Sequence, residues 1–274
     1  MGARALGLVL SSLVFFSSAF SDAATGSEDS KWRTSATLEL GSNLYSSGSS
    51  DYSASSSLVL IPTWRWTPHW TVAMSLSAAK DLTGFRDLVL YDPSLRISRS
   101  AVSLNPFFSV SPAVGMIFPA TSRSREREGL ITAVRPALRL SADLSRLKKP
   151  VLRDVSLMYE VAVSRAFHQY TTSTTGSVNT AWKLSNLVSL GYAPGERWSF
   201  SADFMRNTGW SYQGGARHSF SLGESVNYQF SRALSLAVGL TNDGDVLRAN
   251  GLNSNIAIFD STSSRVFTSF TVIF

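Results

Sequence analysis

Histidine, serine and arginine side chains are the groups in this sequence that could do chemistry. His69, His168 and His218 could act as acids or bases near neutral pH, and serine, the nucleophile that such a base would activate, is abundant. The 274 residues contain no cysteine, which excludes thiolate nucleophiles and disulfides. Metal-ligand spacings, phosphate loops and nucleotide motifs are also missing from the sequence, so we expect no cofactor and no metal.

The stretch His218-Ser-Phe-Ser221 places a possible base beside a possible nucleophile. In a strand, successive side chains point to opposite faces, so Ser219 and Ser221 both lie on the face opposite His218. A serine nucleophile needs its base within hydrogen-bond reach, and side chains on opposite faces of a strand are not within that reach. His69 lies in a turn beside tryptophans, which predicts an interfacial position, and His168 lies near a strand end, where a binding role is open. The histidines therefore favour a protein that is not an enzyme.

The pattern of the elements that position these side chains is clearest in the last ten residues, 265–274. Between Arg265 and Phe274, a period of two places one set of side chains on a single face: Val266, Thr268, Phe270, Val272 and Phe274. This alternation predicts a β-strand. An apolar strand at a chain end would offer an unpaired edge for aggregation, so we expect it to pair with the first strand and close a barrel.

This ending resembles the C-terminal signature of Gram-negative outer-membrane β-barrel proteins, a final strand of alternating apolar residues that ends in phenylalanine. The signature is short, so it implies the class and no particular family. It also implies that the outer-membrane assembly machinery reads the strand ending at Phe274. The lipid of the outer membrane would then surround the barrel.

The composition agrees with a barrel that shows most of its outer surface to lipid. Charged residues make up only 16% of the chain, whereas hydrophobic residues make up 44%. After the N-terminal region there is no apolar run long enough for a membrane-spanning helix. The net charge of +6 is spread along the chain without a Lys/Arg-rich tract interleaved with aromatic residues, so we expect no nucleic-acid partner.

The N-terminal region resembles a secretory signal peptide. Arg4 precedes an apolar run from Ala5 to Phe16, and small residues that suit cleavage follow. We expect cleavage after Ser21, or alternatively after Ala23. The prediction is therefore a signal peptide over 1–21, a periplasmic lead-in over 22–30 and a single transmembrane β-barrel over 31–274.

From residue 31 onward the chain alternates between apolar and small side chains, in runs separated by clusters of Gly, Pro, Asn, Asp and Ser. The pattern predicts an all-β fold, a closed antiparallel transmembrane barrel of about twelve strands. The expected strands are 32–45, 54–66, one starting at 70, 86–98, 107–119, 130–142, 154–168, 181–192, 197–207, 216–230, 233–242 and 265–274.

The loop lengths predict how the barrel stands in the membrane. The connections 193–197 and 231–233 are short, whereas 170–180, 208–215 and 242–263 are long. Short turns in the periplasm and long loops outside the cell are the outer-membrane arrangement, and an even strand number puts both termini in the periplasm. Trp64, Trp66 and Trp70 flank one short turn and predict an arc of an aromatic girdle.

The polar face distinguishes a membrane barrel from a soluble barrel or sandwich. A soluble barrel places bulky apolar residues inside and Lys or Glu outside. Here the polar face consists mainly of small residues such as Ser201, Ser219, Ser235 and Gly239. Such residues suit the wall of a water-filled lumen, and a barrel of about twelve strands is wide enough to hold one.

Several charged residues share this small-residue face. Arg135 and Arg139 are four positions apart on one expected strand, so they point the same way about 13 Å apart. Glu224, by contrast, falls on the lipid face near mid-strand, so we expect a bulge at Gly223 or a shifted register there. The expected lumen-lining charges are Arg33, Arg65, Arg96, Arg135, Arg139, Lys183 and Arg265, with Glu39, Glu160 and Asp203.

This basic excess predicts a porin-like channel for passive diffusion of small solutes with a modest anion preference, because a positive lumen raises the local concentration of anions. The same charges could instead pair across the lumen and stiffen the barrel. One alternative function is lipid hydrolysis: the stretch at His218 resembles the His and Ser of twelve-stranded outer-membrane phospholipases, although the Ser-x-Asn-Gly surroundings are missing. Another is a structural or adhesive barrel that acts through its long loops.

Overall fold

The computed structural model describes residues 30–83, 88–144, 152–247, 254–260 and 262–274. The expected signal peptide, the lead-in up to residue 29 and its cleavage site lie outside these ranges. Within them, no helix is long and apolar enough to cross a membrane.

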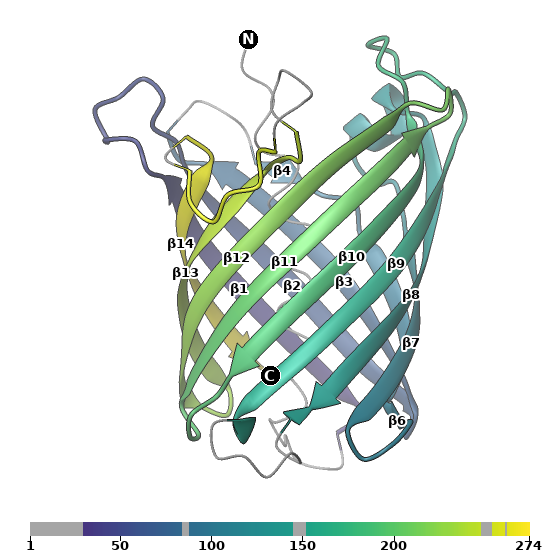
Figure 1. Ribbon diagram of the computed structural model, residues 1–274. Coiled ribbons are helices and arrows are strands. Elements are labelled where there is room, and N and C mark those ends of the chain that lie inside the picture. Colours follow the sequence, from purple (N-terminus) through teal and green to yellow (C-terminus); the bar gives the residue numbers. More distant parts are fainter. Residues whose placement is uncertain (1–29, 84–87, 145–151, 248–253, 261) are drawn as a thin grey trace.

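The chain forms one antiparallel sheet that closes on itself (Figure 1). β2 pairs with both β1 and β3, and β1 pairs with the last strand, β14, so the predicted closed barrel is confirmed. The strands are β1 Trp32–Asn43, β2 Ala54–Thr67, β3 Trp70–Asp81, β4 Val89–Leu90, β5 Ser94–Arg99, β6 Val102–Ser103, β7 Phe108–Ile117, β8 Leu130–Asp143, β9 Val155–His168, β10 Thr180–Tyr192, β11 Trp198–Ser211, β12 Ala216–Ser231, β13 Leu234–Asp245 and β14 Ser264–Ile273.

β4, β5 and β6 together make up one interrupted strand of the wall. β4 and β5 both pair with β3, while β5 and β6 both pair with β7. The wall therefore has twelve strands, as predicted. The ladder with β7 stops at Ser98↔Ala113 and resumes at Val102↔Val110, with the register shifted by one residue.

Closure depends on the ends of the described chain. β1 and β14 pair from Ser35↔Ile273 to Asn43↔Arg265. Beyond them, the amide of Phe274 donates to the carbonyl of Thr34 at 2.8 Å, and the amide of Thr34 donates back to the carbonyl of Phe274 at 3.2 Å. The edge that a terminal strand would expose is thus paired to its last residue.

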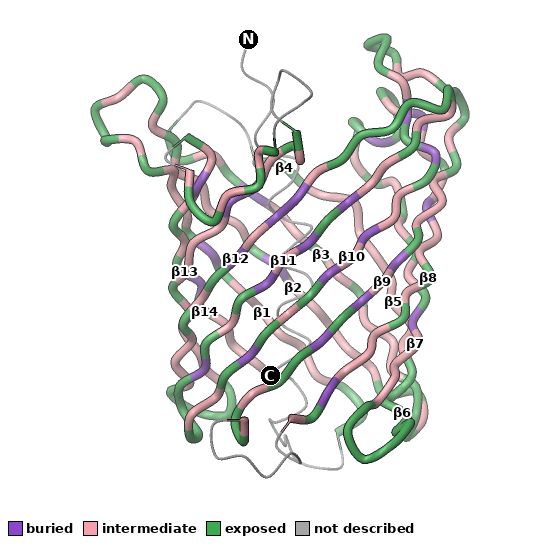
Figure 2. Tube along the Cα trace, viewed as in Figure 1, coloured by how far each residue is buried: buried purple, intermediate pink, exposed green. Residues whose placement is uncertain are grey.

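The two faces of the wall are reversed relative to those of a soluble barrel. Along β1, Leu38 and Leu40 are 47% and 50% exposed, whereas Glu39 between them is 8% exposed. Exposed and buried residues alternate most clearly along β9, β10 and β11 in Figure 2. Large apolar side chains therefore cover the outside, where they are stable only against lipid, and polar or small side chains face the lumen.

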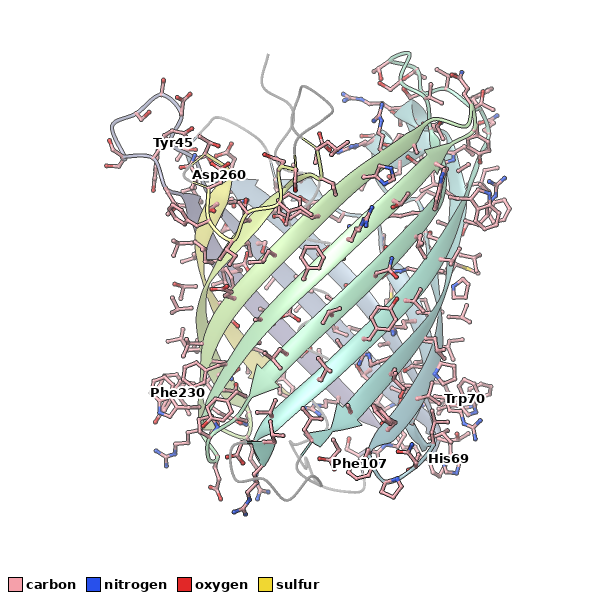
Figure 3. All side chains as sticks on the ribbon, viewed as in Figure 1. Tyr45, His69, Trp70, Phe107, Phe230 and Asp260 are labelled. Atoms are coloured by element: carbon pink, nitrogen blue, oxygen red, sulfur yellow. The ribbon has the colours of Figure 1, made fainter. Side chains whose placement is uncertain are left out.

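Aromatic side chains gather at both ends of this apolar surface. At the end with the short turns, Trp32 stacks on Trp64 with ring centroids 5.8 Å apart, and Trp198 packs on Tyr228 at 4.7 Å. Trp70 and Phe230 lie at the same end of the barrel (Figure 3). At the other end the guanidinium of Arg165 lies 4.8 Å from the ring of Trp182. These are two interfacial girdles, and the predicted arc of tryptophans belongs to one of them.

The connections differ in length between the two ends. Residues 68–69, 104–107, 193–197 and 232–233 join strands at the short-turn end, where Phe274 also lies, although the connection 144–154, partly outside the described residues, is longer. The prediction of a long loop over 208–215 is wrong. β11 and β12 extend to Ser211 and Ala216, and Gly214, with φ of 83°, makes the left-handed turn that closes them into a hairpin.

Glu224 does not sit at a bulge. The ladder from β12 to β11 is unbroken from Ala216 to Tyr228, with Gly223 opposite Asp203 and Glu224 opposite Ala202. The ladder to β13 is equally regular at this point. The expected bulge at Gly223 is therefore wrong, as is a shifted register, and the carboxylate of Glu224 faces the lipid side.

Gly239 has no room for a side chain on the inner face of β13. A Cβ there would lie 2.6 Å from the ring of Phe267 on β14, closer than carbon atoms approach without displacement. We expect Gly239→Ala to lower the free energy of unfolding by about 1–3 kcal/mol, because the ring or the backbone must move. Urea unfolding in lipid vesicles, followed by the heat-modifiable shift on a gel, measures this.

Gly48→Ala is the matched control, because a Cβ at Gly48 meets nothing within 4 Å. Its unfolding midpoint should equal that of the parent. Equal midpoints for both variants would show that the contact between Gly239 and Phe267 does not constrain the wall.

Candidate functional site

A cluster of arginines around one carboxylate lies on the inner face of the barrel. Glu160 on β9 is 2% exposed, and Arg139 lies opposite it on the neighbouring strand β8. Nε and Nη2 of Arg139 donate to Oε2 of Glu160 at 3.1 and 3.0 Å. Nη2 of Arg96 donates to the same oxygen at 3.1 Å. Glu160 thus joins two guanidinium groups that would otherwise repel each other.

Arg96 reaches this cluster from a distant strand. It lies on β5, and β7 and β8 stand between β5 and β9. In the ladder, Gly115 of β7 is the residue between Arg96 and Arg135. Because Gly115 carries no side chain, the long side chain of Arg96 can pass over β7 toward Glu160. The contact joins residues that are 64 positions apart in sequence.

Two further basic residues extend the cluster toward the long-loop end. Arg135 lies four positions before Arg139 on β8, so both point inward, about 13 Å apart. Lys183 lies on β10, paired with Ser164 of β9. We call Arg96, Arg135, Arg139, Lys183 and Glu160 the basic arc. With four basic groups and one acidic group, it carries a formal charge of +3.

The other side of the lumen carries the opposite charge. Glu39 on β1, Asp203 on β11 and Asp243 on β13 face inward, with Arg265 on β14 among them. Nη2 of Arg265 donates to Oγ of Ser55 at 2.6 Å. We call these four residues the acidic arc. Three acidic groups and one basic group give it a formal charge of −2, so the lumen is polarised from side to side.

The ten charged residues predicted for the lumen all share the inner face, but they are not one group. Arg33 and Arg65 lie at the short-turn end, where they belong to neither arc. In the described strands, alternation adds five inner-face charges that the prediction left out: Asp81, Asp143, Arg217, Asp243 and Asp245. The inner face of these strands then carries eight basic and seven acidic groups in place of the predicted seven and three.

Strand ends explain most of this correction. β13 runs to Asp245 and β8 to Asp143, both beyond the predicted boundaries at 242 and 142. Continued alternation past those boundaries would have placed Asp143, Asp243 and Asp245 on the inner face. The excess of four positive charges is therefore wrong. What remains is a net excess of one and a separation of charge between the two arcs.

In the part of the chain that the structure describes, His218 and Ser221 do not form a catalytic pair. His218 lies on the outer face, with Nδ1 3.1 Å from the hydroxyl of Thr208, while Ser221 is buried on the inner face. His168 packs edge-on against Tyr212 with ring centroids 5.6 Å apart. Among the described residues, no group of three or more His, Asp or Glu side chains could hold a metal ion.

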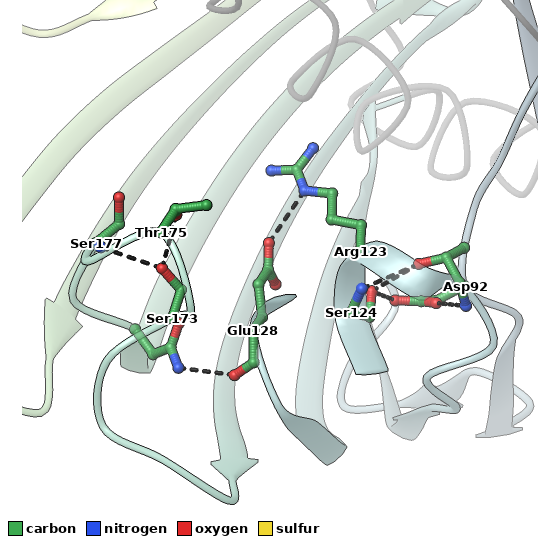
Figure 4. A network of polar contacts seen from close by, with 9 residues as sticks. Asp92, Arg123, Ser124, Glu128, Ser173, Thr175 and Ser177 are labelled. Atoms are coloured by element: carbon green, nitrogen blue, oxygen red, sulfur yellow. Dashed lines mark hydrogen bonds and ion pairs between the residues drawn. The ribbon is translucent and has the colours of Figure 1, made fainter. Parts of the chain in front are cut away.

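The charged segment 122–128 contains a short π-helix, η2 Arg123–Arg127, and lies in a network of polar contacts that joins long connections (Figure 4). Asp92, between β4 and β5, accepts hydrogen bonds from the amides of Ala120 and Thr121 and from the hydroxyl of Ser124. Nδ2 of Asn179, before β10, donates to the carbonyl of Glu128 at 2.8 Å. Three connections at one mouth of the barrel are thereby held together.

Comparison with known proteins supports the fold. No family model and no curated protein matches the sequence. An outer membrane channel from Pseudomonas putida F1 superposes with a TM-score of 0.57 at 12% identity, covering 89% of this chain and 95% of that one. The NanC porin gives a TM-score of 0.53 at 10% identity, covering 87% and 98%. The chain therefore has the fold of outer-membrane channels, as its C-terminal strand predicts.

Glu160 should stabilise the barrel through its two arginines. We expect Glu160→Gln to lower the free energy of unfolding by about 2 kcal/mol, because Arg96 and Arg139 would then face each other without a counter-charge. The matched control is Glu128→Gln, which breaks an exposed pair with Arg123 and should change stability by less than about 0.5 kcal/mol. Urea unfolding distinguishes the two. Equal effects would show that the inner cluster contributes no more than a surface pair.

Proposed function

We propose that this protein is a passive diffusion channel of a bacterial outer membrane, with a modest preference for small anions. Apolar side chains on the outer face and the two aromatic girdles suit a barrel that stands in a bilayer. A wall of twelve strands encloses more space than an eight-stranded barrel, whose interior side chains just fill it.

The short-turn end would face the periplasm. Ser30 and Phe274 lie near this end, and the long connections lie at the other. This is the orientation in which outer-membrane barrels carry their loops outside the cell. In the proposal, the assembly machinery recognises β14, which ends beside Phe274.

The observation that carries the anion preference is the basic arc. Arg135 and Arg139 point inward from one strand, with Arg96 and Lys183 on either side. An arginine stays charged at any physiological pH and can bind a carboxylate or phosphate through two parallel hydrogen bonds. The arc would thus offer successive binding positions to an anionic solute as it moves through the lumen. Low-dielectric walls around the path strengthen this field.

The acidic arc explains why the preference should be modest. Glu160 already compensates part of the charge of Arg96 and Arg139. Glu39, Asp203 and Asp243 line the part of the wall that runs from β11 round to β1 and would attract cations. Anions and cations would therefore pass along different sides of one lumen, with the small net positive charge favouring anions.

Reversing two charges of the basic arc should reverse or weaken this preference. In planar bilayers under a salt gradient, the parent should show a reversal potential of the anion-preferring sign. Arg135→Glu combined with Arg139→Glu should move the reversal potential toward cations, because the arc would change from a formal charge of +3 to −1. An unchanged reversal potential would leave these arginines as structural braces.

Lys80→Glu is the matched control for this experiment. Lys80 lies on the outer side of β3, so the same kind of charge reversal there is separated from the lumen by the wall. Its reversal potential should equal that of the parent. Lys80→Glu reverses one charge and the double variant reverses two, so a shift in Lys80→Glu about half that of the double variant would mean that the measurement reports total charge and not the lumen.

The geometry does not favour the alternative of lipid hydrolysis, because His218 and Ser221 lie on opposite faces of β12. We expect the parent to show no phospholipid hydrolysis, and His218→Ala to leave the conductance unchanged. Hydrolysis by the parent that disappears in His218→Ala would replace the channel proposal with an enzyme.

A further inference from the structure

Arg206 and Glu224 are charged residues on the lipid-facing side of the barrel. Arg206 lies on β11 and Glu224 on β12, and both are exposed. The ladder that joins the two strands is regular at both positions, so neither side chain is turned inward by a bulge. On the neighbouring strand β10, Asn186 lies opposite Arg206. The hydroxyl of outward-facing Tyr159 donates to Oδ1 of Asn186.

Both charges lie deep within the apolar belt. On β11, Arg206 is eight positions from Trp198 of one girdle and four from Trp210 at the other end. On β12, Glu224 is four positions from Tyr228. At about 3.3 Å per residue and a tilt of about 45°, each charge lies roughly 9 Å inside the nearer girdle. An arginine facing lipid near the midplane costs about 2–4 kcal/mol, and a glutamate somewhat less.

The two charges do not compensate each other within one chain. Arg206 is paired with Phe220, which is four positions from Glu224, so their Cα atoms are about 14 Å apart. Among the described residues, neither Arg206 nor Glu224 makes a side-chain hydrogen bond or an ion pair. A barrel surrounded only by lipid would leave both charges desolvated.

The surface around Glu224 is hollow. Ala202, opposite Glu224 in the ladder, is small, and larger side chains stand on either side of it. Together with Glu224 they line an open groove on the outer wall. The groove is lined by Leu190, Phe200, Ala202, Glu224, Val226 and Val238. A long positively charged side chain from outside would fill this groove and pair with Glu224.

Toward the long-loop end, a further segment of the chain packs on the outside of the same wall. Nδ2 of Asn242, on the outer face of β13, donates to the carbonyl of Ala257 at 2.6 Å, so the segment 254–260 lies against the outside of the barrel. Ile258 and Phe259 in this segment are 64% and 58% exposed. They add an apolar surface beside the wall that carries Arg206 and Glu224.

We propose that two copies of this chain associate in the membrane through this wall, with Arg206 of one copy paired to Glu224 of the other. Along the membrane normal, the Cα atoms of Arg206 and Glu224 differ in position by less than about 10 Å. The combined reach of an arginine and a glutamate side chain spans this difference. A symmetry axis along the membrane normal keeps those heights and brings each arginine to the opposite glutamate. The contact thereby replaces lipid around both charges. This inference rests on the membrane placement proposed above and not on what passes through the lumen.

Single cysteines test the contact without background, because the chain has none of its own. We would express Arg206→Cys and Glu224→Cys as chains with tags of different size, reconstitute them together and add a short bis-maleimide that spans an Arg–Glu pair. The expected product is the mixed dimer of the two variants. Val114→Cys is the control: it also faces outward, on β7, which is five strands from β12 in sheet order, and should give no dimer.

Charge exchange provides the second test. In detergent or native nanodiscs, Arg206→Glu should lower the oligomer fraction at least about tenfold, since two glutamates would then face each other. Arg206→Glu combined with Glu224→Arg should restore it, because each copy again offers one charge of each sign. Restoration is not expected from a structural role within one barrel, where the two residues do not meet.

The outcomes separate this inference from the proposed function. A parent barrel that inserts and conducts but stays monomeric in native nanodiscs, or a mixed dimer no more abundant than the Val114→Cys background, overturns the association and leaves the channel in place. A barrel that does not insert into bilayers overturns the channel itself. Heat-modifiable migration on a gel shows that each variant is folded.

Discussion

The barrel depends on pairing every backbone donor and acceptor of its wall within the wall itself. A bilayer offers no water to an unpaired amide or carbonyl, so an open sheet edge cannot stand in it. The pairing of β1 with β14, completed by the two hydrogen bonds between Thr34 and Phe274, removes that edge. Once the sheet is closed, alternation assigns each side chain to lipid or to lumen, and the remaining features follow from that division.

Alternation is also why so much of the fold could be predicted. A period of two needs no knowledge of distant contacts, so the faces of β14 and the shared direction of Arg135 and Arg139 on β8 were evident from their own residues. The ends of the strands were harder to predict, because polar residues such as Asp243 occur both in strands and in loops. The ion pair of Arg96 with Glu160 could not be predicted at all, since it joins strands whose order around the barrel only the fold determines.

Charge is placed differently on the two faces of this wall. Inside, acidic and basic residues are separated into two arcs, and Glu160 holds the arginines of one arc together. Outside, Arg206 and Glu224 are isolated charges in an apolar belt. The sequence indicated that Glu224 was out of place, but the error lay in expecting the backbone to turn it inward. The regular ladder shows that the wall presents this charge outward.

Swelling of proteoliposomes tests the central claim, an open lumen biased toward anions, most directly. The parent protein would be reconstituted, and swelling rates compared for an anionic, a neutral and a cationic solute of matched size. The account predicts swelling above that of empty liposomes for all three, fastest for the anion. No swelling above the empty liposomes, or fastest entry of the cation, would contradict it.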